Sequence, residues 1–177
     1  PTTGLYGLGA DALNSAAVER IYRIKHRDSS KPILVLVKDA TELGKIAAKV
    51  PEAAKRMMAA FWPGSLTIIL EARSELPVVL TGGTGKIGIR VPKHPVARAL
   101  VSALDGLLTG TSANLSGKEG CSSAADLDPG LVNQLDLVLD AGPLKGGFGS
   151  TVVDAAQDPP LVLREGAVSK ERLASVL

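Results

Sequence analysis

The sequence has very few of the residues that build disulfides, zinc centres and covalent active sites. Cysteine occurs once, as Cys121, and histidine twice, as His26 and His94, in a chain of 177 residues. A single cysteine excludes a disulfide within the chain, and these three side chains do not have the spacing of zinc ligands. No histidine lies near Cys121 in the sequence to activate it as a nucleophile. A disulfide scaffold is therefore excluded, and a reducing, cytoplasmic location is expected.

Long apolar runs are missing as well. No run approaches the roughly 18–20 consecutive apolar residues that span a bilayer, and the opening Pro1-Thr2-Thr3-Gly4 does not resemble a signal peptide. We therefore expect no membrane partner. Because the chain opens directly on a turn-like motif, we also expect a β-strand to precede Pro1.

The overall composition is that of one compact domain. Apolar residues make up 45% of the chain and charged residues 21%, which is near the usual balance for a globular fold of this length. We therefore predict a single domain over residues 1–177. The net charge of +2 permits contact with RNA or an anionic substrate without requiring either.

Two familiar nucleotide-binding motifs are absent. The sequence contains no Gly-x-x-x-x-Gly-Lys-[Ser/Thr] loop, and no Gly-x-Gly-x-x-Gly follows a predicted strand. The glycine-rich segments 82–85 and 142–149 instead read as mobile loops, since glycine resists ordering unless something binds it. An ordinary P-loop NTPase or a dinucleotide-dependent dehydrogenase is therefore disfavoured.

The hydrophobic pattern alternates between strands and helices, which predicts an α/β fold with a mixed sheet. Asn14 or Ser15 can cap a helix that ends near Lys25, and Asp39 can open another that continues through Val50, where Pro51 starts a third. Further helices are predicted at 95–104, 129–134 and 169–176. The predicted strands are Ile33–Val37, Leu66–Leu70, Ile87–Val91, Leu107–Thr111, Leu135–Leu139, Thr151–Asp154 and Leu161–Arg164.

The loop from Leu108 to Gly117 is the strongest candidate for a ligand site. It follows an apolar strand and contains Ser112, Asn114 and Ser116 among glycines. Such a loop offers side-chain and backbone donors to an oxyanion. The alternative is a turn in which these side chains bond their own backbone, which is the commoner fate of serine and asparagine.

Three basic segments could complete such a site. Lys25, Arg27 and Lys31 follow the first predicted helix, although cations there can simply favour the negative end of the helix dipole. Arg90 lies inside an apolar strand, where burial requires an anionic partner, either a protein carboxylate or a ligand. Lys86 and Arg164 are the remaining candidates. Together these segments predict a nucleotide site assembled from distant loops. Trp62 is expected to pack against the sheet rather than stack on a base.

Taken in order, these segments resemble the YrdC/Sua5 family of threonylcarbamoyl-AMP synthases over nearly the whole chain. The matching motifs are Pro1-Thr2-Thr3-Gly4-Leu5-Tyr6-Gly7-Leu8-Gly9, Lys25 with Arg27, Lys31-Pro32-Ile33, Trp62-Pro63-Gly64-Ser65-Leu66-Thr67, Ile89-Arg90-Val91-Pro92, Thr111-Ser112-Ala113-Asn114-Leu115-Ser116-Gly117, Ser150-Thr151-Val152-Val153-Asp154 and Arg164-Glu165-Gly166. The resemblance implies a twisted mixed sheet flanked by helices, with an open, concave and basic face. It also implies the short type with a single domain.

The family combines L-threonine, bicarbonate or CO2 and ATP into threonylcarbamoyl-AMP and pyrophosphate, for the modification of tRNA by a downstream transferase complex. By resemblance, the ATP-binding residues are Lys25, Arg27, Lys31, Lys86, Ser112, Asn114 and Arg164, with Lys86 the weakest candidate. The threonine-binding residues are Thr2, Arg90 and Ser150. No catalytic nucleophile is needed, because the reaction depends on positioning and charge neutralisation. Mg²⁺ would bridge the ATP phosphates, and no protein metal ligands are expected.

The sequence departs from the family pattern at four positions. Thr3 stands where the family usually has an acid, and Gly4 where it often has a threonine that contacts the substrate. Leu36 replaces a histidine of some longer members, and Gly120 replaces a serine near the nucleotide. These departures bear on the choice of amino acid more than on ATP binding.

Two other functions stay open at this point. One is a non-catalytic module of the same fold that binds a nucleotide, double-stranded RNA or tRNA, and whose RNA affinity would fall steeply with salt. The other is a carbamoyl-transfer domain of a hydrogenase-maturation protein, which is disfavoured because no zinc-finger or acylphosphatase-like segment flanks the motifs. Retention of the Lys25/Arg27 pair, Arg90 and the Ser112–Asn114 loop favours the synthase.

Overall fold

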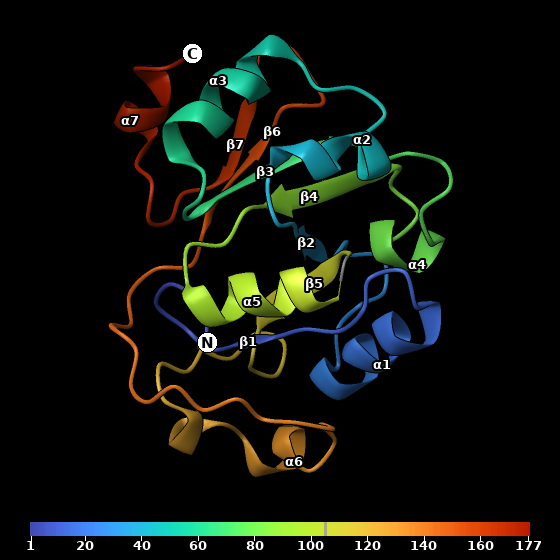
Figure 1. The fold of residues 1–177 in the computed structure, drawn as a ribbon, viewed down its shortest axis with the longest axis vertical. Coiled ribbons are helices and arrows are strands. Elements are labelled where there is room, and N and C mark those ends of the chain that lie inside the picture. Colours follow the sequence, from blue (N-terminus) through green and yellow to red (C-terminus); the bar gives the residue numbers. More distant parts are fainter. Residues whose placement is uncertain (105) are drawn as a thin grey trace.

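The computed structural model describes residues 1–104 and 106–177, and its central feature is a seven-stranded sheet (Figure 1). The strand order is β1-β5-β2-β4-β3-β6-β7. The strands are β1 (Gly7–Leu8), β2 (Leu34–Leu36), β3 (Leu66–Glu71), β4 (Lys86–Arg90), β5 (Leu108–Ser112), β6 (Thr151–Asp154) and β7 (Leu161–Arg164). The pairs β2/β4 and β3/β6 are parallel and the other neighbours are antiparallel. The predicted mixed sheet is confirmed.

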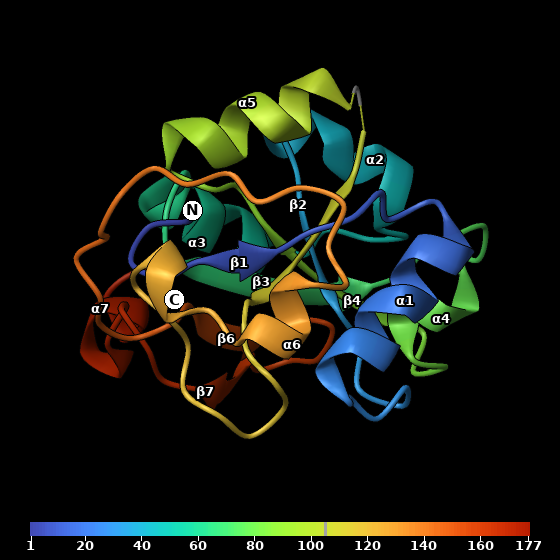
Figure 2. The same ribbon diagram turned by 90° about the horizontal axis from the view of Figure 1, so that it is seen from below.

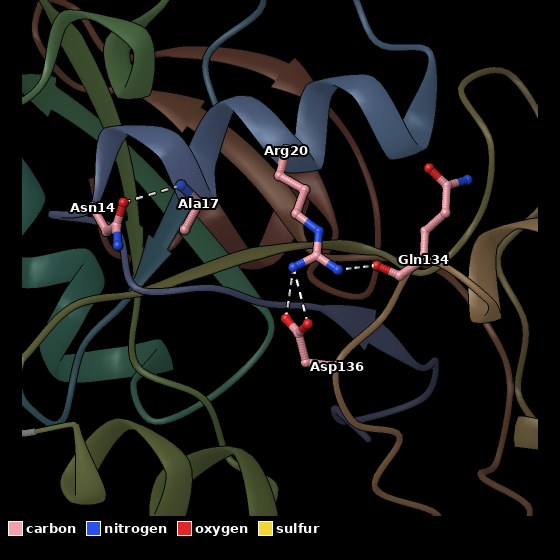
Figure 3. Close-up of polar contacts among 5 residues, drawn as sticks. All are labelled: Asn14, Ala17, Arg20, Gln134 and Asp136. Carbon is pink, nitrogen blue, oxygen red and sulfur yellow. Dashed lines mark hydrogen bonds and ion pairs between the residues drawn. The ribbon is translucent and has the colours of Figure 1, made fainter.

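Helices α1 to α6 lie between the strands along the chain, and α7 follows β7. They are α1 (Ser15–Lys25), α2 (Leu43–Ile46), α3 (Glu52–Phe61), α4 (Val78–Thr81), α5 (Pro95–Ala103), α6 (Pro129–Val132) and α7 (Lys170–Ala174), with short 3-10 turns at Ala40–Glu42 and Ala124–Asp126. The predicted cap of α1 is confirmed, because the Asn14 side chain accepts a hydrogen bond from the amide of Ala17 (Figure 3). Figure 1 places the N-terminus beside β1 and α5 and the C-terminus near α7.

The two faces of the sheet are covered differently. Alternate strand residues such as Val35, Ile68 and Ile89 point into the main core, where helices α1 and α3 pack. The other face carries Leu36 and Leu108, which are covered by Val101 of α5. Helix α5 therefore lies over this face at β2 and β5.

Trp62 packs against the main core, as expected from the sequence. Its ring is half-buried and its indole Nε1 donates to the carbonyl oxygen of Leu66 at 2.7 Å. This hydrogen bond satisfies the polar atom of the ring, so the side chain can pack between the end of α3 and the start of β3.

The predicted strand Leu135–Leu139 is wrong. Within the described chain this segment pairs with no strand, and Leu137 is 70% exposed. It runs as extended chain beyond α6 and is tied to α1 by Arg20, whose guanidinium binds Asp136 at 2.8 Å and the carbonyl of Gln134 (Figure 3). The apolar run reflects its place beside a cavity rather than in the sheet.

The helix predicted from Asp39 to Val50 is too long. The Asp39 side chain does cap a turn, by accepting from the amide of Thr41, but α2 ends at Ile46. Ala47 is extended and bridges to Ala72, which follows β3. Pairing with the sheet therefore ends the helix early, a tertiary effect that helix propensity does not register. Neither β1 nor α4 was predicted from the sequence.

Candidate active site

A cavity of about 400 Å³ lies along this face of the sheet, next to α5. Its walls come from β1, β2, β4, β5, helices α1 and α5, and the segment around 134–139. In Figure 2 this segment is seen in front of the region of α5 and β1, and Figure 1 places it below both elements. The cavity reaches Thr2, Arg90 and Ser150, so the structure brings together all the residues predicted to bind threonine.

A second hollow of about 300 Å³ adjoins the first. Its lining includes Lys25, Arg27, Lys31, Ser112 and Asn114, which come from the end of α1, the loop before β2 and the end of β5. These are five of the seven residues predicted to bind ATP. Thr111 and Ser112 line both spaces, so the end of β5 forms a shared wall.

Lys25 is buried and holds the hydroxyl-rich loop in place. Its side-chain ammonium donates to the carbonyl oxygens of Ser112 and Asn114, both at 2.5 Å, and its own carbonyl accepts from the amide of Ser116 at 2.9 Å. Burial, with a smaller effect from the Arg27 charge, lowers the pKa of Lys25 to about 8. Lys25 therefore both shapes the loop and places positive charge at the second hollow.

The rest of the second hollow is also anchored by backbone contacts. Arg27 donates to the carbonyls of Lys31 and Pro32, which fixes its guanidinium beside the chain entering β2. Asn114 donates both amide hydrogens within its own loop, to Leu115 and Lys118, while its Oδ1 is buried without a partner in the described structure. The turn-forming alternative is thus correct for the Asn114 amide group, and it shapes the wall that Lys25 holds.

Arg90 is the last residue of β4, is nine-tenths buried and lines the first cavity. Its Nε donates to the carbonyl of Gly64 at 2.6 Å, and one Nη to Thr3 Oγ1 at 2.9 Å. Burial, together with the nearby Arg164 charge, lowers the pKa of Arg90 to about 10. No acidic side chain in the described part of the chain forms an ion pair with Arg90. Of the two partners considered from the sequence, an anionic ligand fits this site.

Ser150 and Arg164 lie next to each other at the same end. Arg164 donates to the carbonyl of Ser150 at 2.7 Å, and the Ser150 hydroxyl lies 2.8 Å from that of Thr67. Arg164 is therefore placed beside the residues predicted for threonine rather than in the hollow of Lys25. Thr2 lines the cavity but donates its own hydroxyl to the Leu5 carbonyl at 2.6 Å.

Lys86 lies apart from the other predicted residues. It begins β4 while Arg90 ends it, and its ammonium forms an ion pair with Asp154 at 2.7 Å. Among the described residues it lines neither of the two spaces. The ion pair gives Lys86 a structural role that does not need a ligand.

Two of the departures noted in the sequence have a clear place in the structure. Thr3 binds Arg90 without neutralising it. Gly4 lies against the glycine loop, where its carbonyl accepts from the amide of Gly146, and a Cβ at Gly4 would come within 2.4 Å of the Gly146 oxygen. Thr3 and Thr67 were not predicted as site residues, because a threonine in a turn or a strand carries no sequence signal of its own.

The described residues, which leave out position 105, contain no group of three or more histidine, cysteine, aspartate or glutamate side chains placed to hold a metal ion. In the same part of the chain, no helix is long and apolar enough to cross a membrane.

Comparison with known proteins identifies the family. The model of the Sua5/YciO/YrdC family, described as "Telomere recombination", matches residues 1–166. The chain belongs to this family. Among curated relatives, the threonylcarbamoyl-AMP synthase of Bacillus subtilis is 39% identical over 100% of this chain and 51% of its own length. The synthase of Pyrococcus abyssi is 34% identical over 100% of the chain and 52% of its own length. The chain therefore spans about half the length of these relatives.

Solved structures agree with the family and the fold. The crystal structure of Pyrococcus abyssi Sua5 complexed with L-threonine matches with a TM-score of 0.95, over 100% of this chain and 52% of that one, at 34% identity. Escherichia coli YciO matches with a TM-score of 0.80, over 98% of this chain and 84% of that one, at 32% identity. The Sua5/YrdC resemblance and the mixed-sheet fold predicted from the sequence are confirmed.

Proposed function

We propose that this Sua5/YciO/YrdC chain is an L-threonylcarbamoyladenylate synthase, a nucleotidyltransferase that acts on L-threonine, bicarbonate or CO2 and ATP. One observation carries the proposal: Arg90 is buried at a cavity and has no acidic partner among the described residues, and that cavity shares the Thr111–Ser112 wall with a hollow lined by three cations. A zwitterionic amino acid beside a polyanion fits this pair of spaces. The names of the relatives from Bacillus subtilis and Pyrococcus abyssi support the same activity.

In the proposed reaction the residues bind and orient, and none forms a covalent intermediate. Arg90 holds the threonine carboxylate as a two-pronged donor, with Ser150 beside it. The amine of threonine adds to CO2 and loses a proton to solvent, which gives a carbamate. A carbamate oxygen then attacks the α-phosphorus of ATP, and the bond to pyrophosphate breaks as the new bond forms. The charges of Lys25, Arg27 and Lys31 offset the negative charge on the phosphates.

Mg²⁺ belongs to this proposal as the counterion of ATP. The ion would supply positive charge against the ATP phosphates, and among the described residues no cluster of acidic side chains is placed to hold it. The product is a mixed anhydride, so a transferase must consume it, and tRNA is the acceptor that the family implies. We also propose that residues 1–177 act as one domain.

The test is pyrophosphate release from ATP in the presence of bicarbonate, measured with L-threonine, with L-serine and without an amino acid. Release that requires threonine is the expected result. ATP binding without threonine-dependent release would overturn the synthase proposal. If that result came with RNA binding that weakens steeply as salt rises, it would favour the RNA-binding alternative.

A further inference from the structure

The hydroxyl groups of Thr67 and Ser150 form a buried pair behind the amino-acid end of the cavity. Their oxygens lie 2.8 Å apart, and the two residues are 2% and 5% exposed. Ser150 lines the cavity, whereas Thr67 lies beneath it on β3. Ser150 immediately precedes β6, whose first residue, Thr151, pairs with Leu66. The backbone of the parallel β3/β6 pair therefore fixes the distance between the two hydroxyls.

The positions of the hydroxyl hydrogens follow from counting donors and acceptors. A hydroxyl has one hydrogen to donate and two lone pairs to accept. Among the described residues, the hydrogen-bond partner of the Thr67 hydroxyl is Ser150 Oγ, and Thr67 is shielded from water. Either hydroxyl could donate across this contact, but donation from Thr67 to Ser150 Oγ satisfies the buried Thr67 hydrogen, whereas the reverse arrangement leaves it unsatisfied.

Arg164 strengthens this arrangement from the other side. One of its Nη atoms lies 3.4 Å from Ser150 Oγ and can only donate. With donors on both sides, Ser150 Oγ acts as an acceptor inside the protein, and its own hydrogen is left for the cavity. An acceptor-only group, such as a carboxylate, is the ligand chemistry that satisfies it.

Arg90 faces the same place from the neighbouring strand. Ile68 pairs with Ile89 across the antiparallel strands β3 and β4. The next pair of facing residues in this register is therefore Thr67 and Arg90. We propose that Thr67 is a positioning residue that, together with Arg164, orients the Ser150 hydroxyl as a donor to the carboxylate that Arg90 binds. This rests on the proposed function, because it takes the ligand to be the amino acid.

A purely structural link between β3 and β6 would also place these hydroxyls together, so the test must separate the two roles. Thr67→Val keeps the shape of the side chain and removes the hydroxyl, whereas Thr67→Ser keeps the hydroxyl. Thr81→Val is the matched control, because Thr81 is a buried threonine of α4 whose hydroxyl donates to the Val78 carbonyl. Calorimetry measures the dissociation constants of L-threonine and of ATP for each variant.

We expect Thr67→Val to weaken L-threonine binding about tenfold, since the charge-assisted hydrogen bond from Ser150 is no longer directed. ATP binding stays unchanged, Thr67→Ser restores threonine affinity, and Thr81→Val binds like the wild type. In a Ser150→Ala background, Thr67→Val has no further effect on threonine affinity, because the group that it orients is gone.

Three results would overturn this proposal while leaving the proposed function intact. In the first, Thr67→Val binds threonine as well as the wild type does. In the second, Thr67→Ser is as weak as Thr67→Val. In the third, the losses of Thr67→Val and Ser150→Ala add in the double variant, which would show a packing role. A wild-type chain that binds ATP but not threonine would overturn the proposed function together with this proposal.

Discussion

At the scale of single residues, the main feature of the candidate site is a buried arginine, Arg90, that has no acidic partner among the described residues. Arg90 was predictable, because an arginine within an apolar strand requires an anionic partner. Which partner it has depends on the residues around it in space. Among the described residues the structure supplies Gly64, Thr3 and Ser65, all neutral, so the positive charge of Arg90 is not paired with a carboxylate. Thr67 could not be predicted, because a buried threonine is an ordinary strand residue until its neighbour is known.

We expect Arg90→Ala to raise the dissociation constant of L-threonine about 100-fold, because the amino acid loses a buried, two-pronged charge partner. ATP affinity should change little. Arg90→Lys retains the charge but not the two-pronged donor geometry. Its dissociation constant for L-threonine should lie between those of the wild type and Arg90→Ala. Arg73→Ala is the control, since Arg73 is an exposed arginine paired with Glu75. Threonine-dependent turnover that is unchanged in Arg90→Ala would refute the assignment.

The pKa of Lys25 leads to a pH-dependent ATP affinity. Burial lowers this pKa to about 8, so the ammonium of the free chain is charged below that pH and neutral above it. ATP binding should therefore weaken about tenfold between pH 7 and pH 9. The measurement is the ATP dissociation constant across this range.

Two variants serve as controls for that pH profile. Lys25→Met removes the titrating group and should give weak binding that is flat with pH. Arg27→Met should bind weakly at every pH yet keep the slope, because Lys25 still titrates. A wild-type affinity that is constant from pH 7 to pH 9 would contradict the role given to Lys25.

At the scale of elements, the sequence predicted the long, regular pieces and missed those that depend on distant partners. Helices α1 and α5 have their own caps and apolar stripes, so local pattern was enough. Strand β1 is two residues long and exists because it pairs with Ser112 and Thr111. The run Leu135–Leu139 has strand-like composition, yet within the described chain no strand edge pairs with it, so it forms a cavity wall.

The contact between the opening segment and the glycine loop makes Gly4 sensitive to any side chain. A Cβ there would lie 2.4 Å from the Gly146 oxygen, so Gly4→Ala must displace the loop. We expect a loss of about 1–3 kcal/mol in the free energy of unfolding, which lowers the melting temperature by about 2–10 °C.

Thermal unfolding measures the effect of Gly4→Ala, with Gly44→Ala as the matched control. Gly44 lies in α2 and has no atom within 4 Å of an added Cβ, so alanine there should be neutral or slightly stabilising. If both variants melted at the same temperature as the wild type, the Gly4 contact would not be a constraint.

For the whole molecule, fold class and site location were predictable for different reasons. The mixed sheet followed from alternating patterns spread along the chain, and each strand added a little evidence. The site followed from its motifs, although the sequence could not say which basic residues meet. Lys86 and Arg90 are four positions apart and lie at opposite ends of β4. Lys86 forms an ion pair with Asp154. The chain spans about half the length of the matching synthases. The activity of a synthase of that length must therefore be measured separately from the activity of this chain.

The end of β5 separates two neighbouring spaces that are lined by almost entirely different side chains. Of the described lining residues, Thr111 and Ser112 belong to both spaces, while the cations of one space and Arg90 with Ser150 of the other do not overlap. If the proposed function holds, mutations on one side should alter which amino acid is accepted without disturbing how the nucleotide is held. A scaffold divided in this way could then change one substrate during evolution and keep the other.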